Sequence, residues 1–278
     1  MSTGACARCA SWRASRRAEP RRARANIPAP PPEPALDADP YTHLPHLRGC
    51  LTPATQSALR VTPQVLADWD AQARARALPP DWRWTEAQIE ASRQALLGDP
   101  QPAQDLWVFG YGSLMWDPAI HFCELRRADL PGHVRRFCYQ VLMGRGTPDR
   151  PGLMLSLEPG DGSCHGLAFR IPAALVAEES AMLWRREMIR GGYLPRLLPV
   201  HTPQGEVQAL AFLSNPAHPG HIGELPLAES AAVIATACGQ LGRNRDYLGQ
   251  LDARLLHLGI ADAYIHRLWA AVQALAPE

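Results

Sequence analysis

The chain is organised around residues 106–114, which read LWVFGYGSL. The apolar run Leu106–Phe109 contains aromatic and β-branched residues, which is typical of a short buried strand. It leads directly into a loop in which glycines flank Tyr111. Glycine permits tight turns and close approach to peptide N–H groups. Such a loop can gather N–H donors around a carboxylate or a developing oxyanion, although most glycine turns serve geometry alone.

Length and charge exclude several classes of protein. The 278 residues include 28 basic and 27 acidic ones, for a net charge of +1. This balance indicates no nucleic-acid partner, and no apolar run is long enough to span a membrane. All the basic residues are arginine, which excludes a phosphate-loop lysine and a Schiff-base lysine. The seven cysteines form no clustered pattern beyond a lone C-x-x-C at Cys6 and Cys9, and they favour a reducing compartment over a disulfide framework.

Three segments are predicted along the chain. Residues 1–55 are rich in arginine and proline, and such a composition buries too little apolar surface to offset its ordering entropy, so a disordered tail is predicted. Residues 56–103 are predicted to form a helical appendage without chemistry of its own, with helices that begin at Thr62-Pro63 and at a Thr85–Gln88 capping box. Residues 104–278 are predicted to form the main domain.

The order of elements in the main domain indicates its fold class. Apolar periodicity predicts strands at 106–109, 134–143, 153–157, 166–170, 197–200 and 207–213, and helices at 172–189, 227–237, 244–257 and 261–275. Strands come mostly first and helices last, without regular alternation. The fold class is therefore predicted to be α+β.

One carboxylate in the helix predicted at 172–189 should face inward. Residues spaced by four, three and four positions share one helix face: Val176, Ser180, Leu183 and Glu187. Burial and the negative end of the helix dipole both favour the protonated form of Glu187, which suits a general base. A second interpretation stays open, in which Glu187 pairs with a nearby arginine such as Arg190. Arg185 and Arg186 are expected to project elsewhere.

Several separated motifs resemble the ChaC family of γ-glutamylcyclotransferases, in the expected order. They are VFGYGSLMW at 108–116, RRF at 135–137, GRGT at 144–147, RE at 186–187, GGY at 191–193, and GRN at 242–244 followed by Tyr247-Leu248. The resemblance covers roughly Asp105 to the C-terminus. The spacing between Glu187 and Gly191 is longer than in the eukaryotic pattern and resembles the bacterial branch.

The resemblance implies a small mixed β-barrel flanked by helices. It also implies cleavage of glutathione to 5-oxoproline and cysteinylglycine without metal or cofactor. The abundance of glutathione in the cytoplasm and the absence of an export signal predict a location there. The resemblance places the catalytic base at Glu187, and substrate binding at Val108, Phe109, Gly110, Tyr111, Gly112, Ser113, Leu114 and Tyr247. Arg145 or Arg243 is a candidate clamp for the glycyl carboxylate of glutathione. Oligomeric state is left open.

Two other functions stay open. The family's name suggests a non-catalytic regulatory protein associated with cation transport. The same chemistry would also serve γ-glutamyl amino acids or γ-glutamylamines. A non-catalytic relative would be free to lose Glu187, whereas this chain keeps it. Ser113 is not predicted to be a nucleophile, because no Gly-x-Ser-x-Gly elbow surrounds it.

Overall fold

The computed structural model describes residues 39–75, 78–98 and 104–275. Most of the predicted tail lies outside these residues. Its predicted end at residue 55 is too far along the chain, because the 3-10 turns η1 (Pro45–Leu47) and η2 (Ala54–Gln56) are formed. Leu44, Leu47 and Leu51 are buried in the core. These leucines supply the apolar surface that orders the stretch, which its overall composition concealed.

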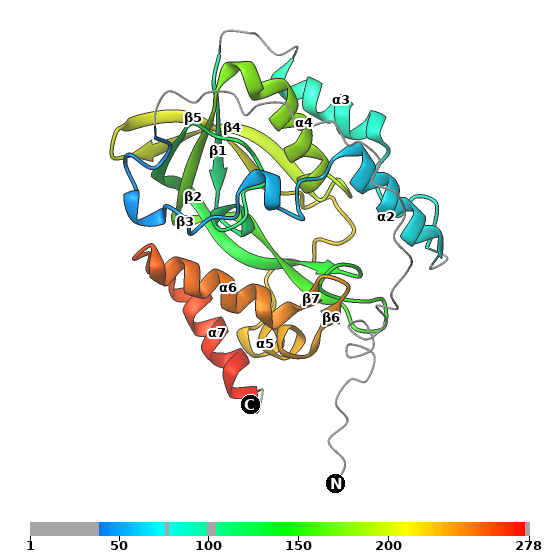
Figure 1. The fold of residues 1–278 in the computed structure, drawn as a ribbon. Coiled ribbons are helices and arrows are strands. Elements are labelled where there is room, and N and C mark those ends of the chain that lie inside the picture. The colour runs from blue at the N-terminus through cyan, green and yellow to red at the C-terminus, as the bar shows by residue number, and fades with distance from the viewer. Residues whose placement is uncertain (1–38, 76–77, 99–103, 276–278) are drawn as a thin grey trace, which may run out of the picture. The chain divides into compact units, whose positions relative to one another are not determined.

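A closed five-stranded barrel forms the centre of the described chain (Figure 1). Its strands are β1 (Leu106–Gly110), β2 (Glu124–Val141), β3 (Gly152–Ile171), β4 (Tyr193–Thr202) and β5 (Gly205–Ser214). Their order around the barrel is β1-β3-β2-β4-β5. Strand β1 pairs parallel with β5 to close the barrel, and the other neighbouring pairs are antiparallel. The predicted α+β class with a mixed barrel is confirmed.

The hairpin of β2 and β3 is longer than the sequence predicts. Strand β3 runs without a break through Pro159-Gly160, which is a typical turn signal. The pairing with β2 accommodates these residues through a register shift between Pro131, which pairs with Ser163, and His133, which pairs with Pro159. Proline and glycine are tolerated at such bulges, so loop-forming residues here lie within strands.

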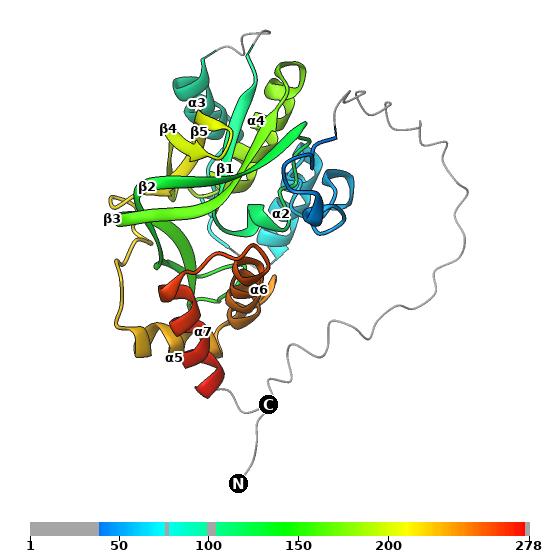
Figure 2. The ribbon, with the colours of Figure 1, turned by 90° about the vertical axis from the view of Figure 1, so that its left-hand side faces the viewer.

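The helices gather on opposite sides of the barrel. They are α2 (Pro63–Ala75), α3 (Glu86–Leu97), α4 (Val176–Glu187), α5 (Leu227–Thr236), α6 (Asn244–His257) and α7 (Ala263–Leu275), with 3-10 turns η3 (Ser113–Met115) and η4 (Ala173–Leu175) and short strands β6 (Cys238–Gly239) and β7 (Gly242–Arg243). Helices α3 and α4 pack together, and α5, α6 and α7 form a second group across the barrel (Figure 2). The predicted capping box is present, with Thr85 and Gln88 bonded reciprocally. Among the described segments, none of the helices combines the length and apolar character needed to cross a membrane.

Large aromatic side chains anchor helix α4 to the barrel. Trp184 is fully buried, and its ring lies edge-on to that of Phe212 on β5, with centroids 5.4 Å apart. Phe109, Phe137 and Phe169 fill the neighbouring core. Close packing of this kind holds side chains in fixed positions. The last turn of α4, which carries Glu187, is therefore fixed relative to the barrel strands.

Candidate active site

A buried arginine shapes the glycine loop that follows β1. Arg135 is 2% exposed, and its Nε donates a hydrogen bond to the Tyr111 carbonyl oxygen at 2.7 Å. Its Nη1 pairs with the Asp262 carboxylate at 3.1 Å. A side-chain Cβ at Gly112 would lie 3.0 Å from the Tyr247 hydroxyl oxygen. Glycine at this position therefore allows α6, which carries Tyr247, to approach the loop closely.

Glu187 lies at the C-terminal end of α4, on the inward face that its spacing predicts. Val176, Ser180 and Leu183 on that face are buried, and the Glu187 side chain is 17% exposed. Its Oε1 lies 3.0 Å from Nε of Arg186, so the arginine that pairs with it is Arg186. Burial raises the pKa of Glu187, and the neighbouring positive charge of Arg186 opposes part of that rise.

Arg186 joins Glu187 to the glycine loop. Nη2 of Arg186 donates to Ser113 Oγ at 2.8 Å, and Nη1 donates to the Asp117 carbonyl oxygen at 2.7 Å. The prediction that Arg186 projects elsewhere is wrong, because the end of α4 meets this loop and a long side chain in its last turn still reaches it. One guanidinium thus contacts both the carboxylate and the loop, and it fixes their separation. An arginine donor cannot take a proton from Ser113, which agrees with its not being a nucleophile.

The loop and Glu187 share a cavity of about 730 Å³, within the size range of small-molecule sites. The predicted site residues on its wall are Tyr111, Gly112, Ser113, Leu114, Glu187 and Tyr247. Val108 and Phe109 are fully buried in the barrel and Gly110 ends β1, so these three do not form part of that wall. They support the loop from behind, and direct substrate binding by them stays a prediction.

Tyr111, Tyr193 and Tyr247 line the same cavity as Glu187. The Tyr111 hydroxyl donates to the Phe212 carbonyl oxygen at 2.8 Å, and the Tyr193 hydroxyl donates to that of Leu155 at 3.1 Å. Within the described part of the chain, no group accepts a hydrogen bond from the Tyr247 hydroxyl. Burial raises the pKa of Tyr247, so this hydroxyl stays protonated. Tyr247 is therefore the tyrosine best placed to donate to a ligand.

The GRN motif positions Tyr247. Asn244 is completely buried at the start of α6. Its Oδ1 accepts from the Leu153 backbone N–H at 2.7 Å, and its Nδ2 donates to the Leu153 carbonyl oxygen at 2.8 Å. The Asn244 amide thus bonds both backbone groups of Leu153, as a neighbouring strand would, and this fixes α6 against β3. Tyr247, one turn further along α6, is thereby held at the cavity.

Part of the cavity wall comes from a segment in which the sequence showed no chemistry. Trp69 of α2 and Trp82 both line the cavity. Asp70 of α2 accepts a hydrogen bond from Trp82 Nε1 at 3.0 Å, and this bond holds Trp82 beside α2. The backbone N–H of Trp84 donates to the Ile189 carbonyl oxygen at 2.8 Å, just after Glu187. This segment holds several tryptophans but is too short to bury them in a core of its own. That imbalance is the sequence signal that could have indicated this wall.

The barrel resembles solved γ-glutamylcyclotransferase structures. The crystal structure of a yeast γ-glutamylcyclotransferase specific to glutathione superimposes with a TM-score of 0.57 and 24% sequence identity. The superposition covers 61% of this chain and 96% of that one. The fold is therefore that of the γ-glutamylcyclotransferases. The sequence model of the family described as ChaC-like protein matches residues 106–275, so the chain belongs to the ChaC-like family.

Two relatives show how far the similarity extends. The glutathione-specific γ-glutamylcyclotransferase of Escherichia coli (strain K12) is 36% identical over 219 residues, which cover 78% of this chain and 94% of the relative. The human glutathione-specific γ-glutamylcyclotransferase 1 is 33% identical, over 64% of this chain and 80% of the relative. The alignment with the E. coli relative is 219 residues long, which is more than the chain has from residue 106 to its C-terminus. That alignment therefore includes part of the segment before β1.

Proposed function

We propose that this chain is a glutathione-specific γ-glutamylcyclotransferase that converts glutathione to 5-oxoproline and L-cysteinylglycine. The relatives from E. coli and human carry this activity in their names. One structural observation supports the proposal most strongly. Glu187 has a raised pKa and is held by Arg186 beside the glycine loop, on the wall of one cavity.

Proton transfer is the task of Glu187 in this reaction. At neutral pH the α-amino group of glutathione is mostly ammonium and cannot attack. The Glu187 carboxylate removes one proton, and the freed nitrogen forms a bond to the γ-carbonyl carbon of the same molecule. The protonated Glu187 then returns that proton to the amide nitrogen as the carbon–nitrogen bond to cysteinylglycine breaks. The attacking nitrogen loses its second proton, which the released amine of cysteinylglycine takes up to become ammonium. A five-membered lactam is released, and no water is consumed.

The rest of the site holds the substrate in a reactive shape. Nucleophile and electrophile belong to one molecule, so catalysis requires a curled conformation with the amine over the carbonyl. The N–H groups of Ser113 and Leu114 begin the turn η3, and the first N–H groups of a helical turn have no partner within it. These groups and the Tyr247 hydroxyl are the proposed donors to the oxyanion. This chemistry uses side chains and backbone of the chain alone.

Product analysis tests the proposal. The purified full chain is incubated with glutathione, and 5-oxoproline, cysteinylglycine and glutamate are quantified. Equal amounts of the first two, without glutamate, are expected. Release of glutamate would indicate a hydrolase, and no turnover would favour a non-catalytic regulatory role. γ-Glutamyl amino acids and γ-glutamylamines, assayed in parallel, are expected to give lower kcat/KM, because they lack the glycyl carboxylate.

Arg145 is a better candidate than Arg243 for binding the glycyl carboxylate of glutathione. Arg145 lines the cavity and lies over the Tyr247 ring, whereas Arg243 is exposed and does not line it. Loss of one charge-assisted hydrogen bond costs about 1.5–3 kcal/mol, so Arg145→Ala is expected to raise KM for glutathione by roughly tenfold or more. Arg243→Ala is the matched control and should leave KM nearly unchanged. Steady-state kinetics that show no increase for Arg145→Ala would remove this role.

The pH dependence of kcat/KM reports the state of Glu187. The reactive form is the carboxylate, so activity falls as the pH decreases through its pKa. Burial raises this pKa above the ordinary value of 4.5, and Arg186 lowers it again in part. Replacing Arg186 by glutamine removes the positive charge, so the acid limb of the profile is expected to move to higher pH. A midpoint that stays in place or moves to lower pH would contradict the assignment.

Location and domain boundaries are part of the proposal. The free cysteines of the described residues, Cys50, Cys123, Cys138, Cys164 and Cys238, suit a reducing compartment, and we propose the cytoplasm, where glutathione is abundant. We also propose that residues 56–103 form a helical segment attached to a catalytic domain at 104–278. In this arrangement α2 contributes a wall of the substrate cavity.

A further inference from the structure

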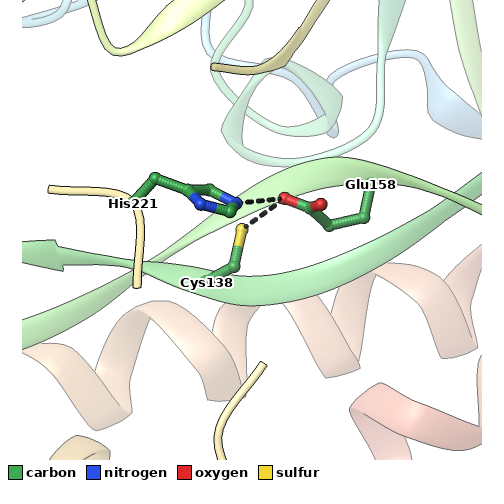
Figure 3. A group of neighbouring side chains, drawn as sticks. All are labelled: Cys138, Glu158 and His221. Carbon is green, nitrogen blue, oxygen red and sulfur yellow. Dashed lines mark hydrogen bonds and ion pairs between the residues drawn. The ribbon is translucent and has the colours of Figure 1, made fainter. Parts of the chain in front are cut away.

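Three donor side chains of different chemistry meet outside the substrate cavity (Figure 3). They are Cys138 of β2, Glu158 of β3, and His221 from the connection between β5 and α5. Their Sγ, carboxylate oxygen and ring nitrogen atoms lie within 4.8 Å of one another. Glu158 Oε1 is 3.1 Å from Cys138 Sγ and 2.9 Å from His221 Nε2. The three side chains thus converge on one point.

The backbone holds these donors in place. Cys138 lies at the register shift between Phe137 and Tyr139, so it is the extra residue of a bulge in β2. Tyr139 forms a backbone bridge with His221, and the N–H of Ile222 donates to the Cys138 carbonyl oxygen at 2.9 Å. The connection that carries His221 is therefore bonded directly to the bulge. Convergence of the donors does not depend on flexible side chains alone.

We propose that Cys138, Glu158 and His221 bind a zinc ion. Thiolate, imidazole and carboxylate are all zinc ligands, and three protein ligands with a water molecule complete a tetrahedral site. Typical zinc–ligand bond lengths put tetrahedral ligand atoms about 3.4–3.6 Å apart. The two hydrogen-bonded distances, 2.9 and 3.1 Å, need to widen by only about half an ångström to reach these values.

The protons balance on binding. Without metal, burial raises the pKa of the Cys138 thiol well above its usual range, so the sulfur carries a proton. Zinc takes the place of this proton, which passes to solvent. His221 binds as the neutral imidazole through Nε2 with its ring proton on Nδ1, and Glu158 binds as the carboxylate. Bonds form from zinc to sulfur, oxygen and nitrogen. Affinity therefore increases with pH.

The ion would act structurally, away from the reacting atoms. None of the three ligands lies on the cavity wall, but Tyr139, His218 and Gly220 do. The Tyr139 ring lies 5.4 Å from that of His221, and its hydroxyl accepts from the Asn215 N–H at 2.6 Å. Zinc at His221 would fix the 215–222 connection behind this wall. The proposal goes beyond the proposed function and does not depend on it.

Titration of the full chain with cobalt(II) and zinc tests the site. The background is Cys6→Ser/Cys9→Ser without a polyhistidine tag, because that C-x-x-C pair can bind metal independently. Cobalt should produce a thiolate-to-metal charge-transfer band that one equivalent of zinc removes. Zinc at about a hundredfold excess over Kd should raise Tm by roughly 5–10 °C. Cys138→Ser should lose both effects, and Cys164→Ser, which replaces another buried thiol, should keep them.

His221→Ala and Glu158→Gln supply independent readings if Cys138→Ser does not fold. Both are expected to weaken cobalt binding at least about tenfold, since each removes a direct ligand. The inference is overturned if the parent chain shows no charge-transfer band with cobalt and no rise in Tm when zinc is added. A band that persists in His221→Ala and Glu158→Gln overturns it equally.

Discussion

Glu187→Gln is expected to reduce turnover of glutathione by at least about a hundredfold, because a positioned general base contributes about 10²- to 10⁴-fold in rate. Glutamine has nearly the same shape as glutamate and removes only the charge that pairs with Arg186. The substrate should therefore still bind, with KM changed little. Glutamine cannot take a proton from the substrate ammonium, so the loss falls on kcat. Steady-state kinetics at saturating glutathione measure it.

Glu178→Gln is the matched control on the same helix. Its side chain is 64% exposed and pairs only at the surface with Arg60, so its kcat should equal that of the parent. Far-ultraviolet circular dichroism establishes that both variants are folded. If Glu187→Gln keeps activity within a factor of two of the parent, Glu187 is not the base.

Arg60→Ala is expected to destabilise the folded chain by about 3–5 kcal/mol, since removal of one partner leaves an uncompensated buried charge. The Glu179 side chain is fully buried. Arg60 donates to both its carboxylate oxygens, at 2.7 and 2.8 Å, and also to the Ala119 carbonyl oxygen at 2.9 Å. This pair connects the segment before α2 to α4. Urea unfolding measures the loss as a lower midpoint.

The contrast with Glu178→Ala isolates the buried partner. Glu178 is the exposed carboxylate that pairs with the same arginine, Arg60. Surface ion pairs of this kind contribute about 0–1 kcal/mol to the free energy of unfolding. Glu178→Ala should therefore unfold close to the parent midpoint. Equal midpoints for Arg60→Ala and the parent would mean that the buried pair does not hold the N-terminal segment to α4.

Local pattern was sufficient to predict the parts of the site that depend on one element. The strand and glycine loop at 106–114 follow from composition and spacing alone. The inward direction of Glu187 follows from helical periodicity, which Trp184 and the barrel then enforce through packing. The α+β class likewise follows from the order of elements. The strand–loop and the direction of Glu187 are each encoded within about fifteen residues of sequence, the range over which periodicity is informative.

The remaining features depend on where distant segments meet. Arg186 reaches Ser113 because α4 ends at the glycine loop, and no spacing within either segment predicts that contact. Asn244 was part of a motif, but its role as a backbone partner of Leu153 is a tertiary fact. The contribution of Trp69 to the cavity depends on how α2 packs. The buried leucines at 44–51 were concealed by their arginine- and proline-rich surroundings.

The central claim is that the substrate's own amine, deprotonated by Glu187, displaces cysteinylglycine without water. The most direct measurement is mass spectrometry of the products formed in water labelled with heavy oxygen. The account predicts unlabelled 5-oxoproline in an amount equal to cysteinylglycine, and no glutamate. Heavy oxygen in the γ-glutamyl product would show that water attacks the γ-carbonyl, and it would contradict the account.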